Sequence, residues 1–126
     1  MGYYTSFTVS AVQIDSNSTK IDNPELFDEI KSKLEAISGY SFEGNLDDEL
    51  YMWESVKWYE CEEDMNQISL LYPDILFVVH GEGEESGDLW NHYHLNGQIQ
   101  RDVAEIKYEG FSRHKLQPYK KERVSW

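Results

Sequence analysis

Apolar residues along this chain change their spacing several times, and this change of period is the feature that most constrains the fold. Between residues 3 and 14 they alternate with polar residues, which predicts a half-buried strand. Asn23 and Pro24 then suit the start of a helix, and apolar residues recur every three to four positions as far as Gly39, a natural helix end. The first third of the chain therefore predicts a strand followed by an amphipathic helix.

The same succession is repeated in the next stretch. Apolar and polar residues alternate over residues 51–59, which predicts a second strand, after an irregular acidic segment at 40–50. Residues 61–72 have helical spacing and acidic residues in the first turn, and Pro73 ends this helix. The continuous apolar run at 75–82 predicts a central strand.

The last part of the chain predicts a hairpin. Asn96-Gly97 is the strongest short-range hairpin signal, and it joins strand-like residues 88–95 to a final strand, bent or bulged, over residues 98–111. The order is β-α-β-α-β-β with an extra C-terminal strand, which predicts an α+β, ferredoxin-like fold. Two helices would cover one face of an antiparallel sheet. We expect one domain over residues 1–111 and a basic C-terminal tail over 112–126, which is either disordered or folded back on the body.

Composition places the chain among ordinary globular domains. Its 126 residues suffice for one core, and 40% hydrophobic residues argue against global disorder. The single cysteine, Cys61, excludes an internal disulfide and fits a reducing compartment. The N-terminal residues read as a strand rather than a signal peptide, and no segment has the roughly 20 apolar residues of a membrane helix. We therefore expect a soluble, intracellular protein.

Charge is the most unusual global property of the chain. The formal net charge is −13, and acidic residues are concentrated between Glu43 and Asp64, where Lys57 is the only base. Such a body repels phosphate backbones, which disfavours direct nucleic-acid binding. The same charge suits either solubility alone or attraction of a basic partner, including a protein that itself holds DNA.

Two parts of the sequence carry a family resemblance. MGYYTSFTV at the start and SVKWYECEEDMNQISLLYPDILFVVHGEGEESGDLWNHYHLNGQIQ further on resemble a group of small, ferredoxin-like proteins carried by bacteriophages and bacterial mobile elements. The resemblance covers roughly the first 110 residues. It implies a phage or mobile-element origin and the cytoplasm of the bacterial host as the location, and it transfers no catalytic residues.

Acidic residues and tryptophans together form the leading candidate site. Trp53 and Trp58 face opposite ways on the predicted strand, so one of them should point away from the helices. A ring rimmed by acids suits binding of a basic protein, because aromatic anchors supply much of the affinity of an interface. The predicted protein-binding residues are Trp53, Glu54, Trp58, Glu60, Glu62, Glu63 and Asp64. The hypothesis is a non-enzymatic interaction protein that binds a host protein, one version being an inhibitor of a host defence or DNA-binding factor that mimics the charge of DNA.

The alternative is a metal- or small-molecule-binding protein that uses the histidine-rich hairpin. His92 and His94 lie two apart on one strand and share a face, and His80 and Glu82 form a second such pair. These four side chains could bind zinc or iron if the hairpin register brought them to one point. Structural histidines that only fill strand positions are the other interpretation, and the prediction is no cofactor.

Enzyme chemistry has no clear signal in the chain. Cys61 lies among Glu60, Glu62 and Glu63, which should raise the pKa of its thiol and blunt its reactivity. Gly81 and Gly83 lack the Lys-Ser/Thr of a phosphate loop, and we expect them to permit a bulge or a close backbone approach. A third hypothesis is a homodimer through the open sheet face or a strand edge.

Overall fold

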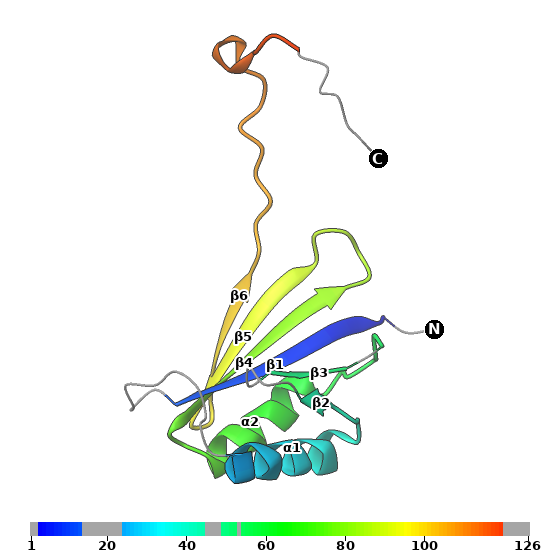
Figure 1. Cartoon of the computed structure of the whole chain (residues 1–126), viewed down its shortest axis with the longest axis vertical. Helices are drawn as coiled ribbons and strands as arrows, with labels where there is room; N and C mark the ends of the chain where they lie inside the picture. Colours follow the sequence, from blue (N-terminus) through cyan, green and yellow to red (C-terminus); the bar gives the residue numbers. More distant parts are fainter. Residues whose placement is uncertain (1–2, 14–23, 45–48, 53, 120–126) are drawn as a thin grey trace.

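A computed structural model of the chain describes residues 3–13, 24–44, 49–52 and 54–119. It is an α+β structure in which two helices lie against one face of a sheet (Figure 1). The elements in chain order are β1 (Thr5–Gln13), α1 (Pro24–Ser38), β2 (Glu43–Gly44), β3 (Glu49–Tyr51), α2 (Cys61–Leu71), β4 (Ile75–Gly83), β5 (Leu89–Leu95), β6 (Gln98–Val103) and the 3₁₀ turn η1 (Arg113–Lys115).

The sheet has six strands in the order β2-β3-β1-β4-β5-β6, and every neighbouring pair is antiparallel. The longest pairing joins β1 to β4, from Thr5 opposite Gly83 to Gln13 opposite Ile75. Both strands alternate buried and half-buried residues along this pairing. The prediction of an antiparallel sheet with two helices on one face is therefore confirmed.

The core lies between the helices and the facing side of the sheet. Ile30 and Leu34 of α1 and Met65 and Ile68 of α2 are at most 1% exposed, because their helical spacing directs them to one side. The remaining buried apolar residues are Phe7, Val9, Ala11, Phe42, Leu50, Trp58, Cys61, Ile75, Phe77 and Val79. Both α1 and α2 lie on this side of the sheet, so within the described part of the chain the other face of the sheet carries no helix.

Turn chemistry explains how β5 and β6 are joined. Asn96 and Gly97 have φ angles of 46° and 79°, the left-handed backbone that a two-residue type I′ hairpin requires at both central positions. The hairpin prediction at Asn96-Gly97 is confirmed. The predicted helices also agree with α1 and α2, although Asn23, the expected N-cap of α1, lies outside the described residues.

Two strand predictions are wrong in extent. Between the helices the structure has the short hairpin β2–β3. Among the described residues from Met52 to Glu60, Val56 alone makes a bridge, to Thr5. The alternating pattern at 51–59 is therefore not a continuous strand, because the chain turns Trp58 into the core instead. At the other end, β6 stops at Val103 rather than at residue 111.

Residues 104–119, here called the C-terminal arm, follow β6 and extend away from both layers (Figure 1). Apart from Ser112, every residue of this arm is exposed. Its large apolar side chains are therefore uncovered: Ile106 is 60% exposed, Tyr108 91% and Phe111 82%. Such exposure is unusual, since large uncovered apolar groups normally mark a contact surface.

Within the part of the chain that the structure describes, no helix combines the length and the apolar character needed to cross a bilayer.

Gly81 marks a close approach between β4 and β5. It pairs with Trp90, and a Cβ atom added to Gly81 would overlap the indole ring of Trp90. We therefore expect Gly81→Ala to lower the free energy of unfolding by about 2 kcal/mol, the usual cost of overpacking. Urea denaturation followed by circular dichroism measures this change.

The Trp90→Ala background supplies the control for this prediction. Without the indole the added methyl group has space, so the further cost of Gly81→Ala should fall below about 1 kcal/mol. Equal costs of Gly81→Ala in both backgrounds would show that the Trp90 contact is not what requires glycine.

Candidate functional site

The predicted acidic residues lie around the start of α2. Glu54, Glu60 and Glu63 are exposed, whereas Glu62 and Asp64 are half-buried. Carboxylates in the first turn of a helix interact favourably with its positive N-terminal end, which explains why this segment tolerates so many acids. Three of the predicted residues are thus accessible to a partner.

Trp58 is a core residue rather than a docking ring. It is 4% exposed and packs edge-on against Phe7 and Phe42, with ring centroids 5.2 and 5.8 Å away. Its indole Nε1 donates a hydrogen bond of 2.7 Å to Asp64 Oδ2, so Asp64 satisfies a buried donor. The expectation that Trp58 belongs to an exposed contact region is therefore corrected. Trp53, the other predicted ring, lies outside the described residues.

Glu62 is also engaged within the chain. Arg101 of β6 donates two hydrogen bonds to its carboxylate, from Nε at 2.6 Å and from Nη2 at 2.8 Å. This bidentate ion pair lowers the pKa of Glu62 below its ordinary value. Glu62 joins α2 to the edge strand of the sheet and is less available to a partner than its exposed neighbours.

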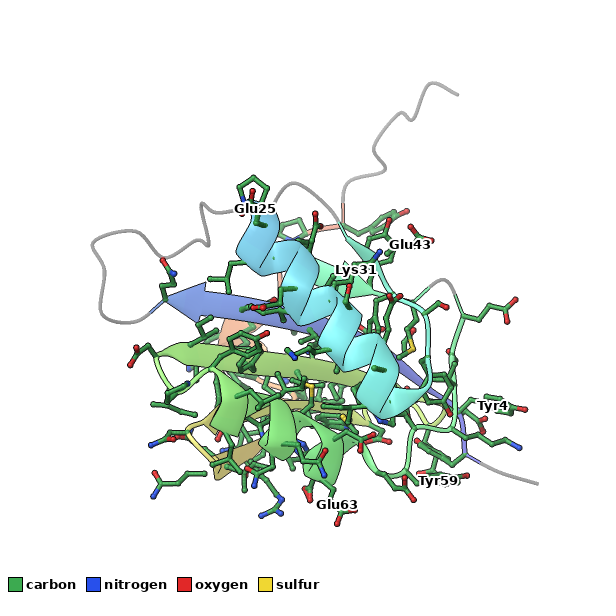
Figure 2. All side chains as sticks on the ribbon, turned by 90° about the horizontal axis from the view of Figure 1, so that it is seen from below. Tyr4, Glu25, Lys31, Glu43, Tyr59 and Glu63 are labelled. Carbon is green, nitrogen blue, oxygen red and sulfur yellow. The ribbon has the colours of Figure 1, made fainter. Side chains whose placement is uncertain are left out.

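Exposed rings beside the acids are tyrosines. Tyr59 is 69% exposed and Tyr4 44%, and Figure 2 shows both projecting outward at the same end of the molecule. We define the acidic tyrosine surface as the five residues Tyr4, Tyr59, Glu60, Glu84 and Glu85, of which all three glutamates are exposed. Glu63 lies along the same edge in Figure 2.

Hydrogen bonds hold this surface together. The backbone amide of Tyr3 donates to the Tyr59 hydroxyl at 2.8 Å, and the amide of Tyr4 donates to Glu84 Oε1 at 2.8 Å. The Tyr3 hydroxyl donates to Asp88 Oδ2 at 2.5 Å and accepts from the amide of Glu85 at 3.0 Å. The start of β1, the segment before α2 and the β4–β5 turn are thereby fixed as one surface.

One cation belongs to the same region. Lys57 places its Nζ 4.8 Å from the centroid of the Tyr4 ring, within the range of a cation–π contact. The Tyr4 ring therefore binds one positive group, the ammonium of Lys57. The surrounding carboxylates favour the approach of additional positive charge from a partner.

The acidic tyrosine surface was missed by sequence reasoning. The alternation over residues 51–59 predicts one regular strand. It does not indicate whether Trp58 or Tyr59 faces outward once that strand is broken. Glu84 and Glu85 lie in the turn between β4 and β5, and Tyr4 and Tyr3 bind to them across 80 and 82 residues of sequence. No short-range pattern contains such a contact.

The histidines do not converge. Register in the β4–β5 hairpin places His92 opposite Val79 and His94 opposite Phe77, so both lie on the core face. His80 lies opposite Asn91 on the other face of the sheet, where its ring nitrogens contact Asn91 Oδ1 at 2.8 Å and Glu82 Oε1 at 3.3 Å. The hypothesis that the hairpin brings all four candidate ligands to one point is therefore corrected.

No group of three or more His, Cys, Asp or Glu side chains within the described ranges is arranged to hold a metal ion. The structural interpretation of the histidines agrees with their surroundings. The His92 ring lies against Trp90, with centroids 4.2 Å apart, and His94 is completely buried.

Burial governs the chemistry of both core-facing histidines. It lowers the pKa of His94 to about 4, and the neighbouring His92 adds to this effect. Burial likewise lowers the pKa of His92, although Glu62 opposes the change. Both rings are therefore neutral at pH 7.

Cys61 is buried in the core, and burial raises the pKa of its thiol, with Asp64 and Glu62 adding to the effect. The prediction of a raised pKa is confirmed, but the main cause is desolvation rather than neighbouring charge. A thiol in this state is a poor nucleophile.

Comparison of the chain with protein-family models, with curated proteins and with solved structures finds no match. The class to which the molecule belongs is therefore given by its architecture: an α+β protein with a six-stranded antiparallel sheet and two helices.

His94 should make stability depend on pH. Its folded pKa of about 4 lies below the value near 6.5 of an unfolded histidine, so the unfolded chain binds more protons between these values. The contribution of the neutral ring is complete above about pH 6.5 and is lost as the pH falls towards 4, to a total of about 3 kcal/mol.

His94→Leu should therefore flatten the dependence of the unfolding free energy on pH between about 4 and 6.5. Chemical denaturation at a series of pH values measures it. His114→Ala, which removes an exposed imidazole from the arm, is the matched control and should leave the wild-type slope unchanged. A His94→Leu profile parallel to wild type would contradict the assignment.

Proposed function

We propose that this protein is a non-enzymatic interaction protein of phage or mobile-element origin that binds a basic host protein through the acidic tyrosine surface. The observation that carries the proposal is the position of Tyr59, which is 69% exposed while its hydroxyl is held by the backbone of Tyr3. A ring fixed in place and left uncovered is prepared for contact, because little side-chain entropy remains to be lost on binding.

Electrostatics support a basic partner. Exposed carboxylates of Glu60, Glu84 and Glu85 surround the two tyrosines, and the whole chain carries a formal charge of −13. Such a field accelerates encounter with a positively charged surface and repels nucleic acid. Tyrosine rings beside the charges supply the apolar contact that charge alone lacks.

One concrete version of this proposal is inhibition of a host defence or of another DNA-binding factor by mimicry of the charge of DNA. The partner would then be a basic nucleic-acid-binding protein, and the site of action would be the cytoplasm of the bacterial host. A phage or mobile-element origin is part of this proposal and stays a prediction from the sequence. The concentration of exposed acids on one part of the surface supports the mimicry of charge.

The proposal includes a ferredoxin-like fold. The elements from β1 to β4 follow the order β-α-β-β-α-β, and their strands are adjacent in the order β2-β3-β1-β4. This succession supports a split βαβ arrangement. In that description β5 and β6 extend the sheet beyond β4.

Capture of a partner from bacterial lysate tests the function. The wild-type chain should retain a basic protein, and Tyr59→Ala should reduce its affinity roughly tenfold because an anchoring ring is lost. The triple variant Glu60→Gln, Glu84→Gln, Glu85→Gln removes the three charges of this surface and should also weaken capture. Raising the salt concentration should weaken wild-type capture as well. Binding of the captured protein is then measured with each purified variant by calorimetry.

The matched control neutralises three exposed acids elsewhere, in Asp28→Asn, Glu43→Gln, Asp74→Asn. This variant has the same net charge as the first triple variant and should bind like wild type. Equal losses of affinity in the two triple variants would show that binding depends on net charge and not on the acidic tyrosine surface. If the wild-type chain captured no protein from the lysate, the proposal would be contradicted.

A further inference from the structure

We infer that the C-terminal arm pairs with the same segment of a second copy, as an antiparallel strand about a two-fold axis through Ile106. The segment at its base has a strand pattern without a strand partner. Ala104, Ile106 and Tyr108 alternate with Glu105, Lys107 and Glu109, which is the period of a half-buried strand. Yet Ile106 and Tyr108 are 60% and 91% exposed.

Backbone direction leaves one edge of this segment free. The Ala104 amide donates to the Leu89 carbonyl at 2.9 Å, so even-numbered residues direct their backbone groups towards β5. In an extended chain the odd-numbered residues, including Glu105 and Lys107, then direct theirs to the outside. Edge strands of this kind bind further strands through their free backbone groups.

Charge selects the register of a self-pairing. With Ile106 opposite Ile106 of the second copy, Glu105 lies opposite Lys107 in both symmetry-related positions. Both residues are odd-numbered, so they fall at a hydrogen-bonded pair of the antiparallel ladder. Opposite charges in facing positions of two strands attract, and like charges repel.

The neighbouring registers are less favourable. A two-fold axis through Lys107 would face lysine with lysine and Glu105 with Glu109. An axis through Glu105 would face glutamate with glutamate. An axis through Tyr108 would place Lys115 opposite Arg101 and would require η1, a 3₁₀ turn, to continue as a strand. The axis through Ile106 avoids each of these conflicts.

Apolar groups agree with the same register. Tyr108 of one copy lies opposite Ala104 of the other, next to the facing Ile106 side chains, and all share one face. The exposed apolar residues at the base of the arm are thereby covered, which gives the hydrophobic effect a reason to favour the pairing.

The wider charge distribution also favours a second copy. The arm, residues 104–119, contains three Lys and Arg against two Glu, in a chain whose formal net charge is −13. Two bodies of this charge repel each other, and the arm is the part of the chain that lessens the repulsion. A contact between arms therefore brings together the least acidic parts of two copies.

Sedimentation velocity of the full-length chain over a range of concentrations tests the inference. The wild-type chain should show a reversible dimer below about 1 mM. Glu105→Lys places two lysines opposite each other at both symmetry-related positions, so the dissociation constant should rise about tenfold or more. Lys107→Glu should weaken the dimer similarly.

The double variant Glu105→Lys, Lys107→Glu restores opposite charges in this register and should return the dissociation constant to within about threefold of wild type. Glu109→Lys is the matched control, since Glu109 faces Val103 of the second copy and should leave the dimer intact. The three substituted positions are all exposed, and circular dichroism checks that the body remains folded.

Each other outcome overturns the inference. A monomer at every concentration would leave the arm for a different partner. A dimer that none of these changes affects would use another surface, such as the open sheet face. Failure of the double variant to recover, with a weakened Glu109→Lys, would place the axis elsewhere.

Discussion

The antiparallel pairing of β1 with β4 is the constraint on which the rest of the structure depends. It joins all nine residues of β1 to β4 and buries Phe7 and Val9 beside Phe77 and Val79. Because the side-chain period of a strand is two, this register decides which face every residue of β4, and then of β5, occupies. The separation of His80 from His92 and His94 is a consequence of the same register that builds the core.

Sequence patterns predicted the elements whose periodicity is long and whose ends have their own chemistry. The first strand, both helices and the Asn96-Gly97 turn belong to this group. The prediction of a strand at 51–59 was wrong because apolar and polar residues can alternate in a segment that is not a continuous strand. What places Trp58 in the core is a set of rings distant in sequence, among them Phe7, together with the carboxylate of Asp64. A periodicity argument includes none of these contacts.

The candidate site shows the same limit. The concentration of acids around the start of α2 was visible in the sequence, and Glu54, Glu60 and Glu63 are indeed exposed. The accessible ring was not visible, because the exposure of Tyr59 follows from the burial of its neighbour Trp58. The tie from Tyr3 to Asp88 spans 85 residues and exists only once β1 has paired with β4. Local sequence therefore indicates the charge of such a surface, and tertiary structure decides which rings it presents.

In the arm the sequence pattern predicts a strand that the structure of one copy does not contain, since β6 ends at Val103. Alternation over residues 104–109 predicts a strand, and a strand is stable only when another strand satisfies its backbone groups. The proposed pairing of two arms would supply that partner and would use none of the residues of the acidic tyrosine surface. A two-fold dimer would then present two such surfaces on one particle. Because the second contact to a multimeric or repeated basic partner is made at high effective concentration, modest affinity at each surface would suffice for stable binding.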